Sequence, residues 1–280
     1  METRQPAAAG RVYPLDPSSL NSKIRECFEH DIGPGNVPEE GVSSGFAGGV
    51  VPHAGYDFSG PCAAHVYERL VESGIPDVVV IFGTMHYSDM DYAVDDRSYR
   101  TPLGTVENVF PELETELEVE RSVHDREHSV EVQLPFLQYF SDSFKLLPVL
   151  VSTRDMERIE EICGEISEAL EDRDTVFLAS TDFTHCGPRY GQPVPENMSP
   201  GQFTEEQDRK ALEMVSEGGP IRFLDTVERN GISMCGPGGV AAVMDIIGEK
   251  SEYELLCHYS SFDLVDGQDS VGYAGVSFTI

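Results

Sequence analysis

The chain alternates short apolar runs with polar, glycine-containing loops and longer amphipathic stretches. The run 77–82, which reads DVVVIF, is typical of a strand that is buried on both faces. The stretch 154–170 instead repeats apolar residues at helical spacing and places charges on its outer face. The same criteria predict further strands at 45–51, 144–151, 175–179, 253–260 and 271–279. They predict further helices at 61–72, 205–216, 221–229 and 238–247.

Strands that alternate with helices in this way are typical of the α/β class. The chain has 280 residues, which is long enough to bury a full core, and no internal repeat or long low-complexity linker divides it. We therefore predict one domain over residues 1–280, with a mixed, mostly parallel central sheet that helices cover on both faces.

Three of the predicted strands run into loops that each contain a histidine. These are His53 in ProHisAlaGlyTyr, His86 in GlyThrMetHisTyr and His185 in SerThrAspPheThrHisCysGly. Ligands of open α/β sheets bind outside the carboxyl ends of the strands, where such loops converge. Imidazole is the commonest metal ligand, so the set favours a metal site over three unrelated loop histidines. For His185 the sequence leaves open whether it binds metal or acts as an acid/base catalyst.

Three other polar residues belong to the same hypothesis. Asp182 lies three residues before His185, where it is placed to orient a ligand histidine or to accept a proton. Cys235 precedes a predicted helix, and a helix N-terminus lowers the pKa of a thiol, although a cysteine taken alone is more often buried and inert. His128, in GluHisSer, is explained equally well by a site role and by pairing with Glu127 or Glu131 at the start of a helix.

The remaining histidines carry no such signal. His65 lies within a helical run and is interpreted as a packing or surface residue. His30, His124 and His258 have no chemical neighbours in sequence, and we assign them no role in a site.

The charge balance is strongly acidic, with 50 Asp and Glu against 19 Lys and Arg and a net charge of −31. A surface of this kind repels nucleic acid and anionic membranes, so we expect neither as a partner. A carboxylate-rich, lysine-poor surface on an ordinary core suits molar salt, where screening shortens the repulsion to a range of about 3 Å. We therefore expect the source to be a halophile.

The sequence also bears on location. No apolar stretch approaches the roughly 20 residues that cross a bilayer, and residues 1–12 lack the apolar core of a signal peptide. The six cysteines form no CxxC pair, so reduced thiols are expected. We predict a cytoplasmic protein.

Five motifs, in chain order, resemble those of the Memo family. They are ProHisAlaGlyTyr (52–56), the Gly-x-x-His loop (83–86), GluHisSerValGluValGlnLeuPro (127–135), SerThrAspPheThrHisCysGly (180–187) and MetCysGly (234–236). The opening ArgGlnProAlaAlaAlaGlyArgValTyrPro (4–14) also resembles the start of that family. Because the resemblance covers nearly the whole chain in one order, it is far more specific than any single motif.

The resemblance implies a fold and a set of roles. Memo proteins are similar in fold to the class III extradiol (LigB-type) dioxygenases, which bind non-heme Fe(II) through two histidines and a glutamate. This implies that His53 and His86 are metal ligands and that Cys235 stands at the position of the glutamate. It further implies acid/base work for His185, with Asp182 nearby, whereas His128 matches a family position without a specified role.

Two departures from the pattern bear on the chemistry. Tyr87 stands where the family often has a second histidine. A thiolate in place of a carboxylate suits Fe(II) or Cu(I), with Zn(II) as the alternative, so ring-cleaving dioxygenation does not follow from the fold. The family is associated with copper or iron binding and redox activity, and in archaea and bacteria with AMMECR1-like and radical-SAM proteins, which are the implied partners of a shared pathway.

Three functions compete at this point. The first is a redox metalloprotein, and if an enzyme an oxidoreductase, with iron or copper on His53, His86 and Cys235 and an unidentified small-molecule or peptide substrate. The second is a zinc-dependent hydrolase at the same site. The third is a binding module with a vestigial pocket and no catalysis. Titratable residues that cluster in one place favour the first two over the third.

The acidic surface predicts that folding depends on salt. We expect the free energy of unfolding, measured by urea denaturation, to fall as KCl is lowered from molar to millimolar concentration, because carboxylate repulsion is then unscreened. A neutral osmolyte at matched osmolarity serves as the control and should not restore stability. Full cooperative stability in dilute buffer would contradict the halophile interpretation.

Overall fold

The computed structural model describes residues 2–39, 41, 45–248 and 251–280, and its strands form one central sheet. The strands are β1 (Thr3–Arg4), β2 (Phe46–Val51), β3 (Val78–Thr84), β4 (Tyr92–Val94), β5 (Ser98–Thr101), β6 (Gly104–Asn108), β7 (Lys145–Val151), β8 (Thr175–Ser180), β9 (His185–Cys186), β10 (Glu252–Ser260) and β11 (Ser270–Thr279). Their order is β1-β5-β6-β7-β3-β8-β2-β11-β10, with β4 beside β7 and β9 beside β11. The central strands β7, β3, β8 and β2 run parallel, whereas β11 and β10 are antiparallel to their neighbours. The predicted mixed sheet is therefore confirmed.

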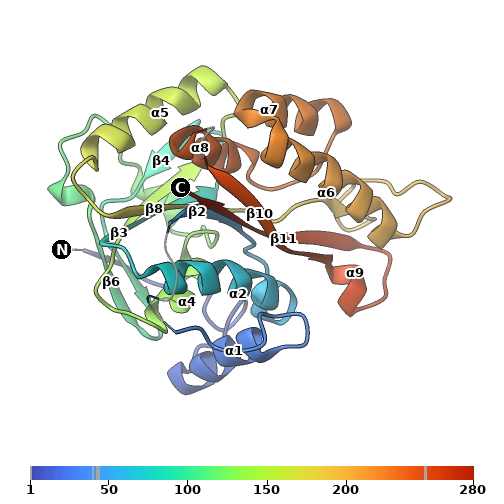
Figure 1. Ribbon diagram of the computed structural model, residues 1–280, viewed down its shortest axis with the longest axis horizontal. Coiled ribbons are helices and arrows are strands. Elements are labelled where there is room, and N and C mark those ends of the chain that lie inside the picture. Colours follow the sequence, from blue (N-terminus) through green and yellow to red (C-terminus); the bar gives the residue numbers. More distant parts are fainter. Residues whose placement is uncertain (1, 40, 42–44, 249–250) are drawn as a thin grey trace.

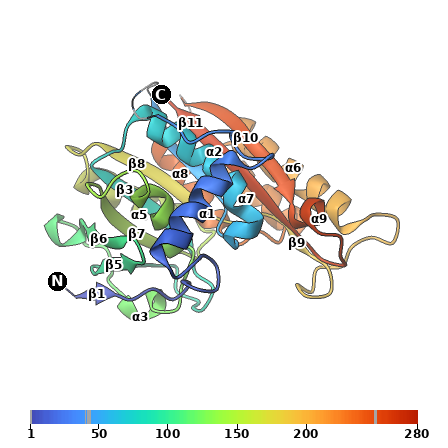
Figure 2. The same cartoon turned by 90° about the horizontal axis from the view of Figure 1, so that it is seen from below.

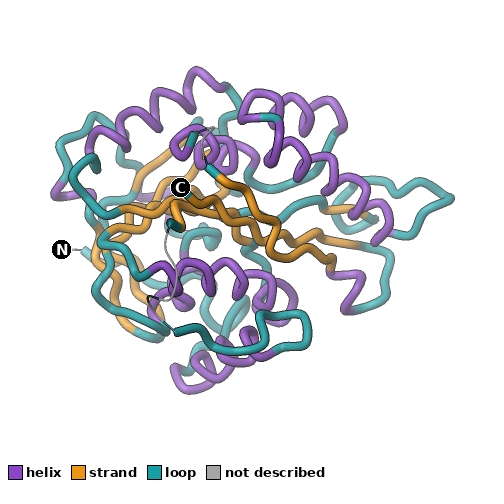
Figure 3. Tube along the Cα trace, viewed as in Figure 1, coloured by secondary structure: helices purple, strands orange, loops and turns teal. Residues whose placement is uncertain are grey.

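Helices cover both faces of this sheet (Figures 1 and 2). They are α1 (Pro17–Glu29), α2 (Tyr56–Ser73), α3 (Arg121–His124), α4 (Leu134–Gln138), α5 (Met156–Ala169), α6 (Pro200–Glu217), α7 (Gly219–Asn230), α8 (Pro237–Ile247) and α9 (Ser261–Leu264), with 3-10 helices η1 (Phe110–Glu112) and η2 (Glu131–Gln133). Helices α5, α7 and α8 lie over one face and α1, α2 and α4 over the other, so Figure 3 shows the strands as a layer between helices. The arrangement is consistent with the LigB-type architecture that the resemblance implies. Within the described ranges, no helix is both long and apolar enough to cross a membrane.

Strand β3 occupies the middle of the sheet because every one of its side chains is apolar or small. All of its residues are buried. Val78, Val80 and Phe82 belong to the core beneath α8, whereas Val79 and Ile81 belong to the core beneath α2. Successive side chains of a strand point to opposite faces, so a strand without a polar face has to be covered on both sides.

Helix α8 approaches the carboxyl end of the sheet closely because its first turn contains glycines. A Cβ on Gly238 would lie 2.3 Å from the carbonyl oxygen of Thr153, and one on Gly239 would lie 3.1 Å from that of Phe82. Side chains at these positions would push the helix away from β3 and β7. The glycines therefore bring Cys235, which precedes the helix, to the ends of the parallel strands.

Several elements differ from the prediction. Helix α2 begins at Tyr56 rather than at residue 61 and carries Pro61 inside, where the proline has no N–H for the helix, while Tyr56 at its start is buried. Helix α1 was not predicted, although Asp16 accepts a hydrogen bond from the Ser19 N–H at 2.8 Å as an N-cap residue should. Strands β4, β5 and β6 were also missed, since strands of three to five residues are too short to show a clear alternation.

Candidate metal centre

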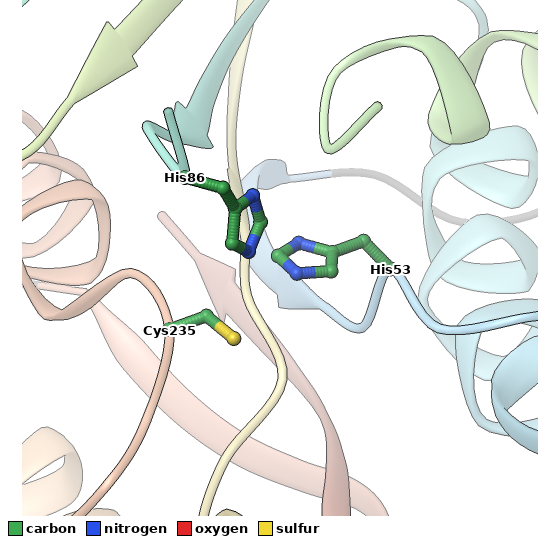
Figure 4. Close-up of side chains that lie close together, drawn as sticks. All are labelled: His53, His86 and Cys235. Carbon is green, nitrogen blue, oxygen red and sulfur yellow. The ribbon is translucent and has the colours of Figure 1, made fainter. Parts of the chain in front are cut away.

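Three side chains from distant parts of the sequence meet at the carboxyl ends of the parallel strands. His53 follows β2, His86 follows β3 and Cys235 precedes α8. One nitrogen of each histidine and the Cys235 Sγ all lie within 4.8 Å of one another. Figure 4 shows the three side chains pointing toward a common point. His53 is buried, whereas the side chain of His86 is 26% exposed, so the cluster is reached from the side of His86.

Hydrogen bonds orient both imidazole rings in the same manner. The Nδ1 of His53 lies 3.1 Å from the Ser180 carbonyl oxygen, and the Nδ1 of His86 lies 3.0 Å from both carboxylate oxygens of Glu127. A carbonyl or carboxylate oxygen only accepts, so Nδ1 carries the hydrogen in each ring. The Nε2 lone pair of each ring is therefore free, which is the arrangement found for metal-binding histidines.

Glu127 fixes the position of His86 as well as its tautomer. The buried carboxylate accepts the backbone N–H of His86 at 2.9 Å, that of His128 at 2.7 Å and that of Ser129 at 3.0 Å. Burial raises the pKa of Glu127, but hydrogen bonds from His128 and His86 outweigh it and hold that pKa well below its usual range. The sequence indicated Glu127 only as a possible partner of His128, and its bond to His86 was missed.

Asp182 holds two of the three candidate ligands through their backbones. Its carboxylate accepts the N–H of His53 at 2.8 Å and that of Ala54 at 3.2 Å. Its own carbonyl oxygen accepts the N–H of Cys235 at 3.1 Å. Asp182 therefore links the loop after β2 to the segment before α8, and the histidine that it contacts is His53, through the backbone N–H.

His185 faces the sulfur of Cys235. Its Nδ1 lies 2.8 Å from the Phe183 carbonyl oxygen and therefore carries the hydrogen, which leaves Nε2 as an acceptor 3.7 Å from the Cys235 Sγ. The edge of the Tyr190 ring packs against His185, with the ring centroids 4.9 Å apart. This position suits a proton acceptor for the thiol better than a place among the three candidate ligands.

The expected lowering of the Cys235 pKa is wrong for the protein without a bound cation. Burial and then the negative charge of Asp182 raise the pKa of the thiol. Cys235 also lies one residue before the N-cap Gly236, and its N–H is already bonded to Asp182, so the helix terminus adds little. A thiolate at this position requires a cation, and a bound metal ion supplies one.

His53 is neutral near pH 7. Burial lowers the pKa of His53 to about 4, against the attraction of Asp182, and the neighbouring His128 and His86 lower it further. Neutral imidazole is the form that binds metal ions, so His53 does not have to lose a proton before binding.

His128 lies within the same cluster. Its ring stacks on that of His86 with centroids 5.0 Å apart, and its centroid lies 5.3 Å from that of His53. Its Nδ1 is 3.3 Å from Glu127 Oε1, and its side chain is 23% exposed. His86, Glu127 and His128 also place ligand atoms within 4.8 Å of one another, but the His86 Nδ1–H and the His128 backbone N–H already donate to the carboxylate. We therefore interpret this second group as a support of the first.

Two histidines without an assigned role have clear structural partners. His124 is buried, with Nδ1 2.8 Å from the Tyr99 hydroxyl and Nε2 3.2 Å from the Ala93 carbonyl oxygen. His258 lies 3.0 Å from the buried carboxylate of Asp208. Neither belongs to the candidate metal centre.

Comparisons with known proteins identify close relatives. The family model described as Memo-like protein matches residues 4–277. A MEMO1 family protein of Methanopyrus kandleri is 40% identical, with 98% of each chain covered. One of Methanothermobacter thermautotrophicus is 35% identical, covering 98% of this chain and 99% of that protein. An uncharacterized Escherichia coli K12 protein of known structure matches at a TM-score of 0.48 and 11% identity, over 83% of this chain and 99% of that one.

The low pKa of His53 predicts a loss of stability in mild acid. The ring titrates near pH 6.5 when unfolded and at about 4 when folded, so its stabilising contribution is complete above pH 6.5 and is lost as the pH falls toward 4. Between pH 7 and pH 5, wild-type protein freed of metal should lose about 2 kcal/mol more unfolding free energy than His53→Gln. Urea denaturation at both pH values measures this. The exposed-site variant His30→Gln is the control, and an equal loss in wild type and His53→Gln would contradict the prediction.

Proposed function

This chain belongs to the Memo family, and we propose that it is a metalloprotein in which His53, His86 and Cys235 hold one iron or copper ion. The observation that carries the proposal is the meeting of two oriented imidazoles and one thiol within 4.8 Å. Two imidazole nitrogens and one soft sulfur fit iron or copper, and they fit zinc as an alternative. When bound, iron or copper would supply redox chemistry at this point. The partial exposure of His86 supports access for a small molecule.

His185 is the residue that we propose to move protons. Binding of a cation requires the thiol of Cys235 to lose its hydrogen, and the nearby acceptor is His185 Nε2 at 3.7 Å. The bond from His185 Nδ1 to a backbone carbonyl keeps Nε2 available for this transfer. The same atom can then exchange protons with a substrate, as a general acid or base.

Asp182 and His128 complete the proposed site in different ways. Asp182 keeps His53 and Cys235 at their separation, so we propose a positioning role for it rather than a direct part in proton transfer. His128 stands beside His86 on the accessible side of the cluster, where it can contact a substrate or carry a proton between substrate and solvent.

The proposal predicts stoichiometric metal that depends on the three ligands. Protein purified without oxygen, in molar salt and without a histidine tag should contain about one iron or copper ion per chain by mass spectrometry. His53→Ala and Cys235→Ser should each lose it, because two protein ligands hold a metal ion much less tightly than three. His30→Ala and Cys163→Ser change a histidine and a cysteine outside the site and should retain it.

Other outcomes of the same measurement separate the competing functions. Zinc that is lost in the same variants would contradict the redox assignment and favour hydrolytic chemistry. Absence of stoichiometric metal after reconstitution with iron, copper and zinc would contradict a metal centre altogether. A binding module without catalysis would then be the better interpretation.

Glu127 should tune the affinity of the site without being a ligand. In Glu127→Gln the carboxylate charge that orients His86 is lost while the shape is kept, so the dissociation constant for the metal should rise by about 10–100-fold. Competition with a chromophoric chelator measures this constant, and circular dichroism checks the fold. Glu116→Gln alters an exposed glutamate as the matched control. Unchanged affinity in Glu127→Gln would contradict the orienting role.

A further inference from the structure

We infer a second reactive site, separate from the metal centre, in which the sulfur of Cys257 on β10 attacks a hydroperoxide and then forms a disulfide with Cys62 of α2. Helix α2 packs against β10 and β11 on the face turned away from α6 (Figure 1). The inference does not depend on a metal ion, and it concerns residues to which the sequence assigned no chemistry.

The register of β10 and β11 places both sulfurs on one face of the sheet. Cys257 pairs with Gly275 across the antiparallel ladder. Residues directly opposite in such a ladder point their Cβ atoms to the same face, about 4.5–5.5 Å apart. A Cβ on Gly275 would lie 3.6 Å from the Cys62 Sγ, so this sulfur occupies the face that the Cys257 side chain also faces.

Gly275 also keeps the space between the two cysteines open. A Cβ there would lie only 3.0 Å from the Cys62 carbonyl oxygen, so any larger residue would push α2 away from the strand. The Cys62 Sγ lies 3.9 Å from the Cys257 carbonyl oxygen, which confirms that the two residues are direct neighbours.

Cys62 and two neighbouring histidines make Cys257 the thiol of the pair that ionises more readily. His65, on α2, lies with Nε2 3.1 Å from the Ile32 carbonyl oxygen, and the Cys257 Sγ lies 4.0 Å from that same oxygen. His258 follows Cys257 in the strand. A hydrogen bond from Cys62, which outweighs burial, acts with His65 and the charge of His258 to lower the pKa of Cys257 to about 5.

A thiol that attacks an oxidant has to be accessible and ionised, whereas a resolving thiol can be buried and protonated. The two cysteines differ in this way. Cys257 is partly exposed, whereas Cys62 is fully buried, and burial raises the pKa of Cys62. An oxidant from solvent therefore meets Cys257 first. Cys27 and Cys163 are buried, and burial raises the pKa of both, so they provide an internal comparison within the same chain.

The reaction balances with a hydroperoxide as the two-electron oxidant. The Cys257 sulfur attacks the terminal oxygen of the hydroperoxide and the O–O bond breaks. A sulfenic acid forms on Cys257, and the alkoxide leaves and takes a proton from water. The Cys62 sulfur then attacks the sulfur of Cys257, the S–O bond breaks, and the hydroxide leaves with the proton of Cys62 as water. Two thiols and one hydroperoxide thus yield one disulfide, one alcohol and one water.

The test follows each cysteine separately in the full-length protein in molar salt. Brief exposure to iodoacetamide, followed by peptide mass spectrometry, should label Cys257 at least about ten times faster than Cys27 or Cys163, because the thiolate is the reacting form. Equimolar cumene hydroperoxide should then convert the Cys62 and Cys257 peptides into one disulfide-linked species that a reductant separates. Cys235→Ser, treated identically, should give the same product, since the metal centre takes no part.

Variants of the pair identify the order of events. Cys62→Ser should leave a sulfenic acid on Cys257 that dimedone traps, whereas Cys257→Ser should leave Cys62 unmodified. Cys163→Ser is the control and should behave as wild type. Equal alkylation of Cys257 and the buried cysteines, or oxidation of Cys257 without a link to Cys62 in the wild-type chain, would overturn the inference, and neither observation depends on a variant that folds.

Discussion

The positions of the loops in this protein depend on a few buried carboxylates. Burying a charge costs several kcal/mol unless hydrogen bonds and opposite charges compensate it. Glu127, Glu131, Asp182 and Asp208 are buried, and each is surrounded by N–H or O–H donors. Most of these donors are backbone groups of distant segments, so satisfying the charge also fixes where the segments lie. Of the 50 acidic residues in the chain, these few thus hold distant segments together through hydrogen bonds.

Contacts of these buried carboxylates connect the N-terminal segment to the candidate metal centre. Glu131 accepts the N–H of Ala8 at 2.8 Å and the Tyr13 hydroxyl at 2.6 Å, and it forms a buried ion pair with Arg4 at 2.6 Å. Arg4 also donates to the carbonyl oxygen of Glu127, whose carboxylate orients His86. The opening segment, remote in sequence from the site, therefore supports the loop that positions one of its ligands. The Memo resemblance begins at residue 4, and these contacts show what that opening segment does in the structure.

Local patterns in the sequence were sufficient for the fold class and for most long elements, since the periods of buried strands and amphipathic helices follow directly from backbone geometry. They also brought His53 and His86 together as candidates, because parallel strands end at one edge of the sheet, whereas the place of Cys235 beside them was implied by the Memo resemblance. They could not reveal the bond from Glu127 to His86 or the place of Asp182, since such pairings depend on tertiary contacts between segments. The predicted start of α2 was wrong for a similar reason, because the packing of Tyr56 overrides the local signal of Pro61.

Cys235 and Cys257 show how strongly the surrounding groups determine the pKa of a thiol. Cys235 was expected to be acidic because a helix follows it, yet burial and the nearby Asp182 raise its pKa. Cys257 lies in a strand, and a hydrogen bond from Cys62, acting with two histidines, lowers its pKa. Position in a secondary-structure element is therefore a weaker guide to the pKa of a thiol than its burial and its hydrogen-bond partners. Within one chain, burial and Asp182 raise the pKa of one sulfur, and Cys62 with two histidines lowers that of another.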